Sequence, residues 1–250
     1  MLLVIVSFFL ISLTAITGVY AIEENDTIVT ISKDEADLSG DGQNESIYLK
    51  GVPYQEGQSE EDYLKEIYIE IAASNGKTYT IPLDSGSKAT LAVVDLNHDG
   101  LKELFASVLM GDAEESVTGY LYSFKNFSRS ELTVPEPLEM DAKFSNGYKA
   151  EMRLLQTGKT YVFDLKSRKK YYKKLGFYYK GKLNEPTELS VNTFNSLKSV
   201  QLKNGRMGIK GVQKVTGVAK ADTIAYVESN WYLNRGHWEL FNAKVKKGDS

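Results

Sequence analysis

Apolar and polar residues alternate along most of the chain, and this period of two predicts β-strands. The segment 66–74, "EIYIEIAAS", alternates isoleucine with polar or aromatic side chains, and Asn75-Gly76 then predicts a tight turn into a second strand at 78–82. The same pattern recurs in the apolar runs 89–94, 103–110 and 117–124. The chain is therefore predicted to be mainly β, with neighbouring strands paired as antiparallel hairpins.

The second half follows the same pattern, with turn residues between the alternating segments. Hairpins are predicted at Thr157-Gly158, at Asn204-Gly205 and near 234–236. The stretch 167–179, "SRKKYYKKLGFYY", is compatible with a short helix or an aromatic strand. A single helical turn capped by Ser59 is a further prediction. Helices are thus expected to be short and few.

Two acidic loops interrupt the alternation, at 37–45 and at 95–103, 58 residues apart. Each copy reads as strand, acidic loop, strand, longer loop, strand, and a repeat of this length is typical of one β-propeller blade or one layer of a repeated β-fold. Residues 140–250 contain no third acidic loop. We therefore predict repeated antiparallel four-stranded, blade-like sheets in a partial or irregular β-propeller-like arrangement.

The residue types in these loops suit a hard cation, which prefers six to eight oxygen ligands. Short oxygen-bearing side chains stand at loop positions 1, 3 and 5, glycine at 6 allows a sharp turn, and the carbonyl of position 7 and a glutamate at 9 complete the set. The candidate ligands are Asp37, Ser39, Asp41, Gln43 and Glu45 in the first loop, and Asp95, Asn97, Asp99, Leu101 and Glu103 in the second. The expected ion is calcium.

An EF-hand is the alternative calcium site, but it needs a glutamate at position 12 between two helices. Position 12 is Tyr48 in one loop and Ala106 in the other, and both loops are flanked by β-periodic segments. The motifs "LAVVDLNHDGLKELFASV" and "ADLSGDGQNESIYL" resemble the FG-GAP or VCBS-like repeats of integrin-α-type β-propellers, and the whole chain resembles secreted VCBS-repeat proteins of bacilli. The resemblance implies calcium-braced hairpins over residues 30–125. Its Phe-Gly and Gly-Ala-Pro elements are missing here.

Residues 1–21 carry no charged side chain and end in Val19-Tyr20-Ala21, which predicts a secretion signal cleaved before Ile22. The alternative is a retained N-terminal membrane anchor, because about 20 apolar residues can span a bilayer. After cleavage, no membrane span remains. The chain has no cysteine, which excludes disulfides, thiolate nucleophiles and cysteine-based metal sites. A secreted or cell-surface protein is expected.

Charge is distributed unevenly behind a net charge of −3. Residues 22–70 hold 14 acidic and 3 basic side chains, whereas residues 143–182 hold 2 acidic and 12 basic ones. With the joint placed at Pro135 and Pro137, this divides the chain into an acidic repeat region, 22–135, and a basic, aromatic β-rich region, 136–250. The basic aromatic segment 166–182 is expected to bind an anionic envelope polymer or another surface protein. Nucleic acid is not expected, because the protein is exported.

Known catalytic motifs are absent from the sequence, and neither His98 nor His237 lies in a nucleophile or metal motif. A pair of carboxylates could still be assembled by the fold, as in glycosidases. Candidates for such a pair are Asp164, Glu185, Glu188, Asp222, Glu228 and Glu239. The main hypothesis is a non-catalytic binding or structural module at the cell envelope. The alternative is a secreted hydrolase of polysaccharide or wall polymer, with calcium purely structural.

Overall fold

A computed structural model of the chain describes residues 27–53, 63–111 and 115–248. The predicted signal segment 1–21 and the Ser59 cap lie outside these residues. Within them, no helix is sufficiently long and apolar to span a bilayer.

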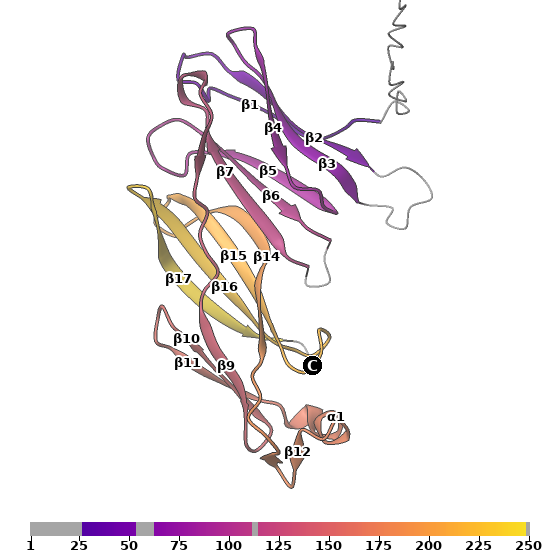
Figure 1. The fold of residues 1–250 in the computed structure, drawn as a ribbon. Helices are drawn as coiled ribbons and strands as arrows, with labels where there is room; N and C mark the ends of the chain where they lie inside the picture. The colour runs from indigo at the N-terminus through magenta and orange to yellow at the C-terminus, as the bar shows by residue number, and fades with distance from the viewer. Residues whose placement is uncertain (1–26, 54–62, 112–114, 249–250) are drawn as a thin grey trace, which may run out of the picture.

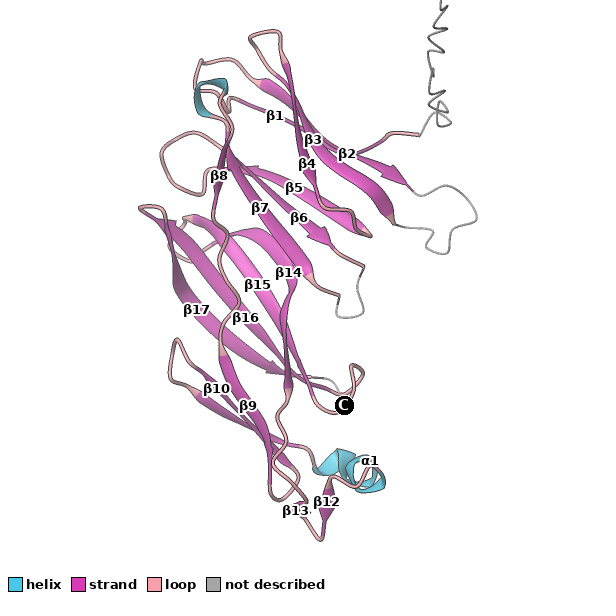
Figure 2. Ribbon diagram, viewed as in Figure 1, coloured by secondary structure: helices cyan, strands magenta, loops and turns pink. Residues whose placement is uncertain are grey.

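Antiparallel strands make up most of the described chain, and each sheet is named here in chain order (Figure 2). The first sheet contains β1 (Val29–Ala36), β2 (Glu45–Pro53), β3 (Leu64–Ala72) and β4 (Thr78–Leu83). The second contains β5 (Lys88–Val94), β6 (Glu103–Leu109), β7 (Val117–Ser123) and β8 (Ser130–Leu132). The third contains β9 (Met140–Ser145), β10 (Lys149–Leu154) and β11 (Thr160–Asp164). The fourth contains β14 (Ser190–Gln201), β15 (Met207–Thr216), β16 (Thr223–Asn234) and β17 (His237–Lys247).

Helical turns are short, as predicted. They are η1 (Lys125–Phe127), η2 (Lys166–Arg168) and α1 (Lys169–Lys174), and the small hairpin of β12 (Tyr178–Tyr179) and β13 (Lys182–Leu183) follows α1. The predicted turns at Asn75-Gly76, Thr157-Gly158 and Asn204-Gly205 each connect two paired strands. Each of these glycines has a positive φ, which a side chain rarely adopts.

The second sheet is buried on both faces, because β6 has apolar side chains at successive positions. Leu104 and Ala106 pack with Ile69 of the first sheet, whereas Phe105 packs with Leu197 of the fourth. The first, second and fourth sheets therefore follow one another in space (Figure 1). A core shared by the second and fourth sheets joins the two regions on either side of residue 135.

One face of the long fourth sheet is covered by two smaller sheets. Ile209 and Val215 lie on the same side of β15, since they are six residues apart on a strand. Ile209 packs with the second sheet, and Val215 packs with Met152 of the third. Between these contacts, the extended segment 133–139 crosses from the second sheet to the third. The opposite face of β15 carries partly exposed Lys210 and Lys214.

A mainly β fold with several antiparallel sheets is confirmed, but the predicted propeller-like arrangement is wrong. The third sheet lies between the second and the fourth along the chain, yet in space it covers the far end of the same face of the fourth sheet. Consecutive propeller blades would instead pack in chain order around an axis. The described residues form no closed propeller or barrel.

Candidate functional surfaces

The two acidic loops occupy equivalent positions, since the first connects β1 to β2 and the second connects β5 to β6. They also lie against each other: a Cβ atom built on Gly40 would be 3.3 Å from Leu101 Cδ1. The turn η1, cyan at the upper left of Figure 2, lies beside both. Asn126 N–H donates to Ser39 O (2.9 Å), and Lys125 Nζ lies 3.8 Å from Asp99 Oδ2. The two loops and η1 thus form one surface.

In the first loop, the backbone wraps around Asp37. Its Oδ1 accepts from Gly40 N–H (2.7 Å), and its Oδ2 accepts from Gly42 N–H (2.9 Å). Both glycines have positive φ (81° and 85°), so the turn favours residues without a side chain. Glycine at loop position 6 therefore serves the sharp turn that the sequence indicated.

Glu45 closes the first loop from a fully buried position. Its Oε2 accepts from Leu38 N–H at 2.7 Å. The Ser74 hydroxyl, from the turn before β4, is 3.0 Å from Glu45 Oε1 and 2.7 Å from Asp41 Oδ2. One hydroxyl has a single hydrogen to donate, so two carboxylates share one donor. The Ser74 hydrogen bond, followed by that of Gln43 N–H, lowers the pKa of Asp41.

The second loop repeats these contacts. Asp95 accepts from His98 N–H (2.7 Å) and Gly100 N–H (3.2 Å), and buried Glu103 accepts from Leu96 N–H (2.8 Å). Asn97 Nδ2 donates to Glu103 Oε1 at 2.6 Å. Burial raises the pKa of Glu103, the Leu96 and Asn97 N–H groups oppose that shift, and the negative charges of Asp99 and Asp95 add to it. This buried carboxylate therefore has negative neighbours.

These loops supply oxygen donors, as hard cations require. Among the described residues, however, no three acidic or histidine side chains gather at a point that would hold a metal ion. Asp37 and Asp95 instead turn both carboxylate oxygens to backbone N–H groups within their own loops. The fold brings together Asp41 and Glu45 at Ser74, and Asn97 with Glu103. The side chain of Leu101 packs on Gly40, and calcium ligation by any of the predicted residues stays a prediction.

The predicted basic segment 166–182 folds into η2, α1 and the β12–β13 hairpin, which form one end of the molecule (Figure 1). We call this segment the basic tip. Its aromatic residues are divided by burial: Tyr172 and Tyr178 are buried, whereas Tyr171 and Tyr179 are 41% and 67% exposed. Leu175 is also exposed. Part of the aromatic content thus forms the core, and the remainder lies on the surface.

A buried polar network fixes the basic tip to the fourth sheet. Arg168 Nη1 lies 2.6 Å from Asp222 Oδ1, and Arg168 Nη2 donates to Thr223 O (2.8 Å). The Tyr172 hydroxyl donates to the Asp222 carboxylate (2.9 Å to Oδ2). Burial, followed by the negative charge of Asp222, raises the pKa of Tyr172. The sequence indicated Asp222 only as a candidate catalytic residue. Its partners Arg168 and Tyr172 lie about fifty residues away, so no local pattern predicted the network.

The lysines of the basic tip are exposed. Lys169 lies 5.6 Å from the centre of the Tyr148 ring, and Lys180 lies 5.3 Å from the centre of the Tyr179 ring. Lys166 lies 3.5 Å from exposed Asp164. Among the described residues, no ion pair is found for the other six lysines of the tip, which are Lys169, Lys170, Lys173, Lys174, Lys180 and Lys182. The tip therefore presents a concentrated positive charge.

Two of the candidate catalytic carboxylates, Glu228 and Glu239, are held by local contacts. Glu228 lies between Lys246 (2.6 Å) and Lys210 (3.0 Å), and the Lys246 hydrogen bond is the main cause of its lowered pKa. Glu239 accepts from Tyr232 and Asn234, which lower its pKa.

Of the other carboxylate candidates, Asp164 is the last residue of β11, and Asp222 lies in the loop before β16. Asp164 accepts from Lys166 N–H, and Glu185 and Glu188 are exposed before β14. His98 and His237 are exposed in the second acidic loop and at the start of β17. A general acid needs a raised pKa, whereas the pKa values of Asp164, Glu228 and Glu239 are lowered.

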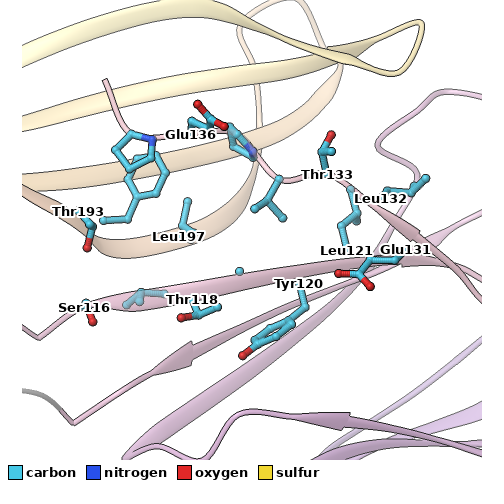
Figure 3. Close-up of a pocket in the computed structure, with 16 residues that line it drawn as sticks. Ser116, Thr118, Tyr120, Leu121, Glu131, Leu132, Thr133, Glu136, Thr193 and Leu197 are labelled. Atoms are coloured by element: carbon cyan, nitrogen blue, oxygen red, sulfur yellow. The ribbon is translucent and has the colours of Figure 1, made fainter. Parts of the chain in front are cut away.

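A groove that the sequence did not indicate lies between β7 and the segment 133–137 (Figure 3). Its volume is about 600 Å³, and Phe194 and Leu197 of β14 also line it. The sequence indicated this place only through Pro135 and Pro137, which predicted a joint between the acidic and basic regions.

Comparison with known proteins finds similarity to a different family from the predicted one. Residues 138–246 match the family model of the YybI C-terminal domain. Over 219 residues the chain is 22% identical to the uncharacterized protein YybI of Bacillus subtilis (strain 168), and the match covers 84% of this chain and 81% of that protein. The resemblance to FG-GAP or VCBS repeats is therefore wrong. The loop motif is short, and it also forms in the hairpins of sheets that build no propeller.

Two solved structures, both rhamnogalacturonan lyases, have limited likeness to the chain. The exotype enzyme YesX matches with a TM-score of 0.40 and 15% identity, and YesW with 0.39 and 16%. Each match covers 88% of this chain, which spans only about a third of either enzyme (33% and 34%). Similarity at this level gives no evidence about the activity of this chain. The third sheet, the basic tip and the fourth sheet are, by sequence, similar to the YybI C-terminal domain.

Proposed function

We propose that the chain is an exported, non-catalytic binding module of the cell envelope, which binds an anionic polymer through the basic tip. The observation that carries this proposal is the set of exposed lysines on a segment fixed by Arg168, Tyr172 and Asp222. Long lysine side chains lose entropy when they bind, and a rigid segment reduces the remaining cost of binding. The tip is therefore suited to a partner with repeated negative charges.

Exposed aromatic groups lie beside these lysines, and they indicate which kind of anionic partner the tip would bind. Tyr171, Leu175 and Tyr179 offer apolar surface next to the ammonium groups. A polymer that alternates phosphate with sugar or polyol units would contact both kinds of side chain, through ion pairs and through packing on tyrosine rings. Another surface protein with an acidic patch is the alternative partner.

Calcium is the second part of the proposal, and its role is structural. Three acidic side chains lie in each loop, and the exposed Lys125 lies 3.8 Å from Asp99 of the second loop. Buried Glu103 beside Asp95 and Asp99 is an arrangement that a divalent cation would stabilise. The residues that would hold the ions are the ten ligands predicted above. Bound calcium would join the two contacting loops and so fix the first sheet against the second.

Export is proposed from the sequence alone, because residues 1–21 lie outside the described residues. Removal of this apolar segment would release the protein, and its retention would anchor the chain at its N-terminus. The described chain starts beside the first sheet, far from the basic tip (Figure 1). An anchored chain would therefore direct the tip away from the membrane and toward wall polymers.

The hydrolase alternative gains no support from the geometry. Glu228 and Glu239 have lowered pKa values and are engaged with lysines or with tyrosine and asparagine. Asp222 belongs to the network that fixes the basic tip. Their lowered pKa values and their hydrogen-bonded oxygens do not suit Glu228 or Glu239 to protonate a leaving group.

The test is binding of purified wall teichoic acid, a polyphosphodiester, to the full chain at increasing salt. We expect saturable binding that weakens as salt screens the charges, and a large loss in the double variant Lys169→Glu/Lys170→Glu. The matched control is Lys77→Glu/Lys203→Glu, which makes the same charge change at exposed turns outside the tip. Equal losses in the two double variants would show only a net-charge effect, and retained binding in the tip variant would overturn the proposal.

A further inference from the structure

An unpaired strand edge lies inside the groove beside β7. Strand β8 pairs with β7 only over Leu121 to Ser123, so within the described residues the preceding part of β7 has no paired strand on that side. The residues that line the groove include Val117 to Leu121, which is this same part of the strand. The groove thus runs along the part of β7 that a longer β8 would cover.

The register determines which backbone groups face the groove. Met110 N–H donates to Ser116 O, so Thr118 and Tyr120 are the residues that exchange hydrogen bonds with β6. Val117 and Gly119 lie between them and direct their N–H and C=O groups to the open edge. We find no partner for these groups within residues 27–53, 63–111 and 115–248. Four backbone hydrogen-bonding groups therefore face the groove.

The opposite wall of the groove, the segment 133–138, is fixed at both ends. Trp238 Nε1 donates to Thr133 O (2.7 Å), and Gln213 exchanges two hydrogen bonds with Leu138 (2.8 and 3.1 Å), so both ends of the segment 133–138 are fixed. Between them, the β7–β8 register would bring Val134 and Glu136 opposite Gly119 and Val117, but no pairing is found there within the described residues. The groove therefore stays open beside an unpaired strand.

The charge and shape of the lining indicate the occupant. Among the lining residues, Glu131 and Glu136 are the only charged ones, and Leu197 and Phe194 provide apolar surface. Figure 3 shows Glu136 and Thr133 across the groove from Thr118 of β7. A strand alternates its side chains between two faces, so an extended peptide could present apolar groups to the floor and cations to the glutamates.

We propose that this groove binds an extended peptide segment with alternating apolar and basic side chains, which adds as a strand to the edge of β7 and continues the line of β8. The site uses residues other than those of the basic tip and the acidic loops. Its hydrogen bonds come from the backbone, and its preference for basic segments comes from Glu131 and Glu136.

The test uses a fluorescent, capped hexapeptide of alternating valine and lysine, titrated into the full chain by anisotropy. The Val117→Pro variant removes one edge N–H, and edge positions tolerate proline. Binding is expected to fall at least about tenfold in Val117→Pro, and also in Glu136→Lys. The matched control is Val162→Pro on the exposed edge of β11, where no hydrogen bond to β10 is lost and binding should be unchanged. A valine–glutamate hexapeptide should not bind.

Hydrogen exchange of the unmodified protein provides a second readout, which holds even if Val117→Pro fails to fold. The Val117 and Gly119 amides should exchange rapidly in the free chain and become protected by the lysine peptide. Binding without this protection, or binding that both Val117→Pro and Glu136→Lys retain, would overturn the proposal. It would also be overturned by dimerisation that Val117→Pro abolishes, because a second copy of the chain would then occupy the edge.

Discussion

Arg168 of η2 and Asp222 of the loop before β16 form a buried ion pair with 2.6 Å between Nη1 and Oδ1. Their side chains are only 13% and 5% exposed, and the hydroxyl of buried Tyr172 donates to the same carboxylate. The pair attaches the basic tip to the loop before β16. The proposed binding by the tip would therefore depend on a largely buried contact.

Replacement of Asp222 by alanine should destabilise the protein by about 3–5 kcal/mol, because it leaves the Arg168 charge buried without its partner. Urea unfolding monitored by tyrosine and tryptophan fluorescence measures this change. The control is Asp164→Ala, which breaks only the exposed ion pair and backbone hydrogen bond with Lys166 and should have a much smaller effect. Similar stability of the two variants would show that the buried pair does not hold the tip.

Calcium should raise the melting temperature of the full chain measured against an EGTA reference. One site at about 100 times its dissociation constant adds roughly 2.7 kcal/mol, which corresponds to a shift of several degrees. Asp95→Ala and Asp99→Ala should reduce the shift, and Asp164→Ala outside the loops should not. An unchanged melting temperature up to millimolar calcium would rule out the proposed structural role.

Glu228 should make a stabilising contribution that depends on pH. Its pKa is lowered in the folded protein, first by the Lys246 hydrogen bond, so the contribution is present above the ordinary carboxyl pKa and is lost as pH falls through the lower folded value. Glu228→Gln should cost about 0.5–1 kcal/mol at pH 7, because the pairs lie at the surface and are screened. The difference from the unmodified protein should shrink below about pH 4. Thermal unfolding across pH measures it, and a difference independent of pH would contradict the ion-pair explanation.

Tyr179 should contribute to polymer binding without contributing to stability. Its ring is 67% exposed, so Tyr179→Ala should weaken binding of teichoic acid while the melting temperature stays within about two degrees. The matched substitution Tyr178→Ala removes a buried ring that packs 4.5 Å from the Tyr148 ring, and it should destabilise the protein by about 3–5 kcal/mol. A binding loss only in Tyr178→Ala would assign the effect to tip folding rather than to surface contact.

Local chemistry in the sequence determined the strands and turns. The alternating isoleucines of β3 and the Asn75-Gly76 turn specify a hairpin wherever the sheet is placed, because side-chain direction and positive φ are properties of a few consecutive residues. The acidic loops were located in hairpins for the same reason. Lys and Arg enrichment likewise identified residues 166–182 as a basic surface before its helix could be distinguished from a strand.

Only the tertiary structure decided how the sheets are arranged and which distant residues meet. A period of two shows that Ile209 and Val215 share a buried face, but it does not show that the second sheet covers one and the third sheet the other. The propeller prediction was wrong for this reason. The Arg168–Asp222 pair and the open edge at Val117 and Gly119 also depend on chain crossings, because burial and pairing are set by neighbours in space that local sequence does not specify.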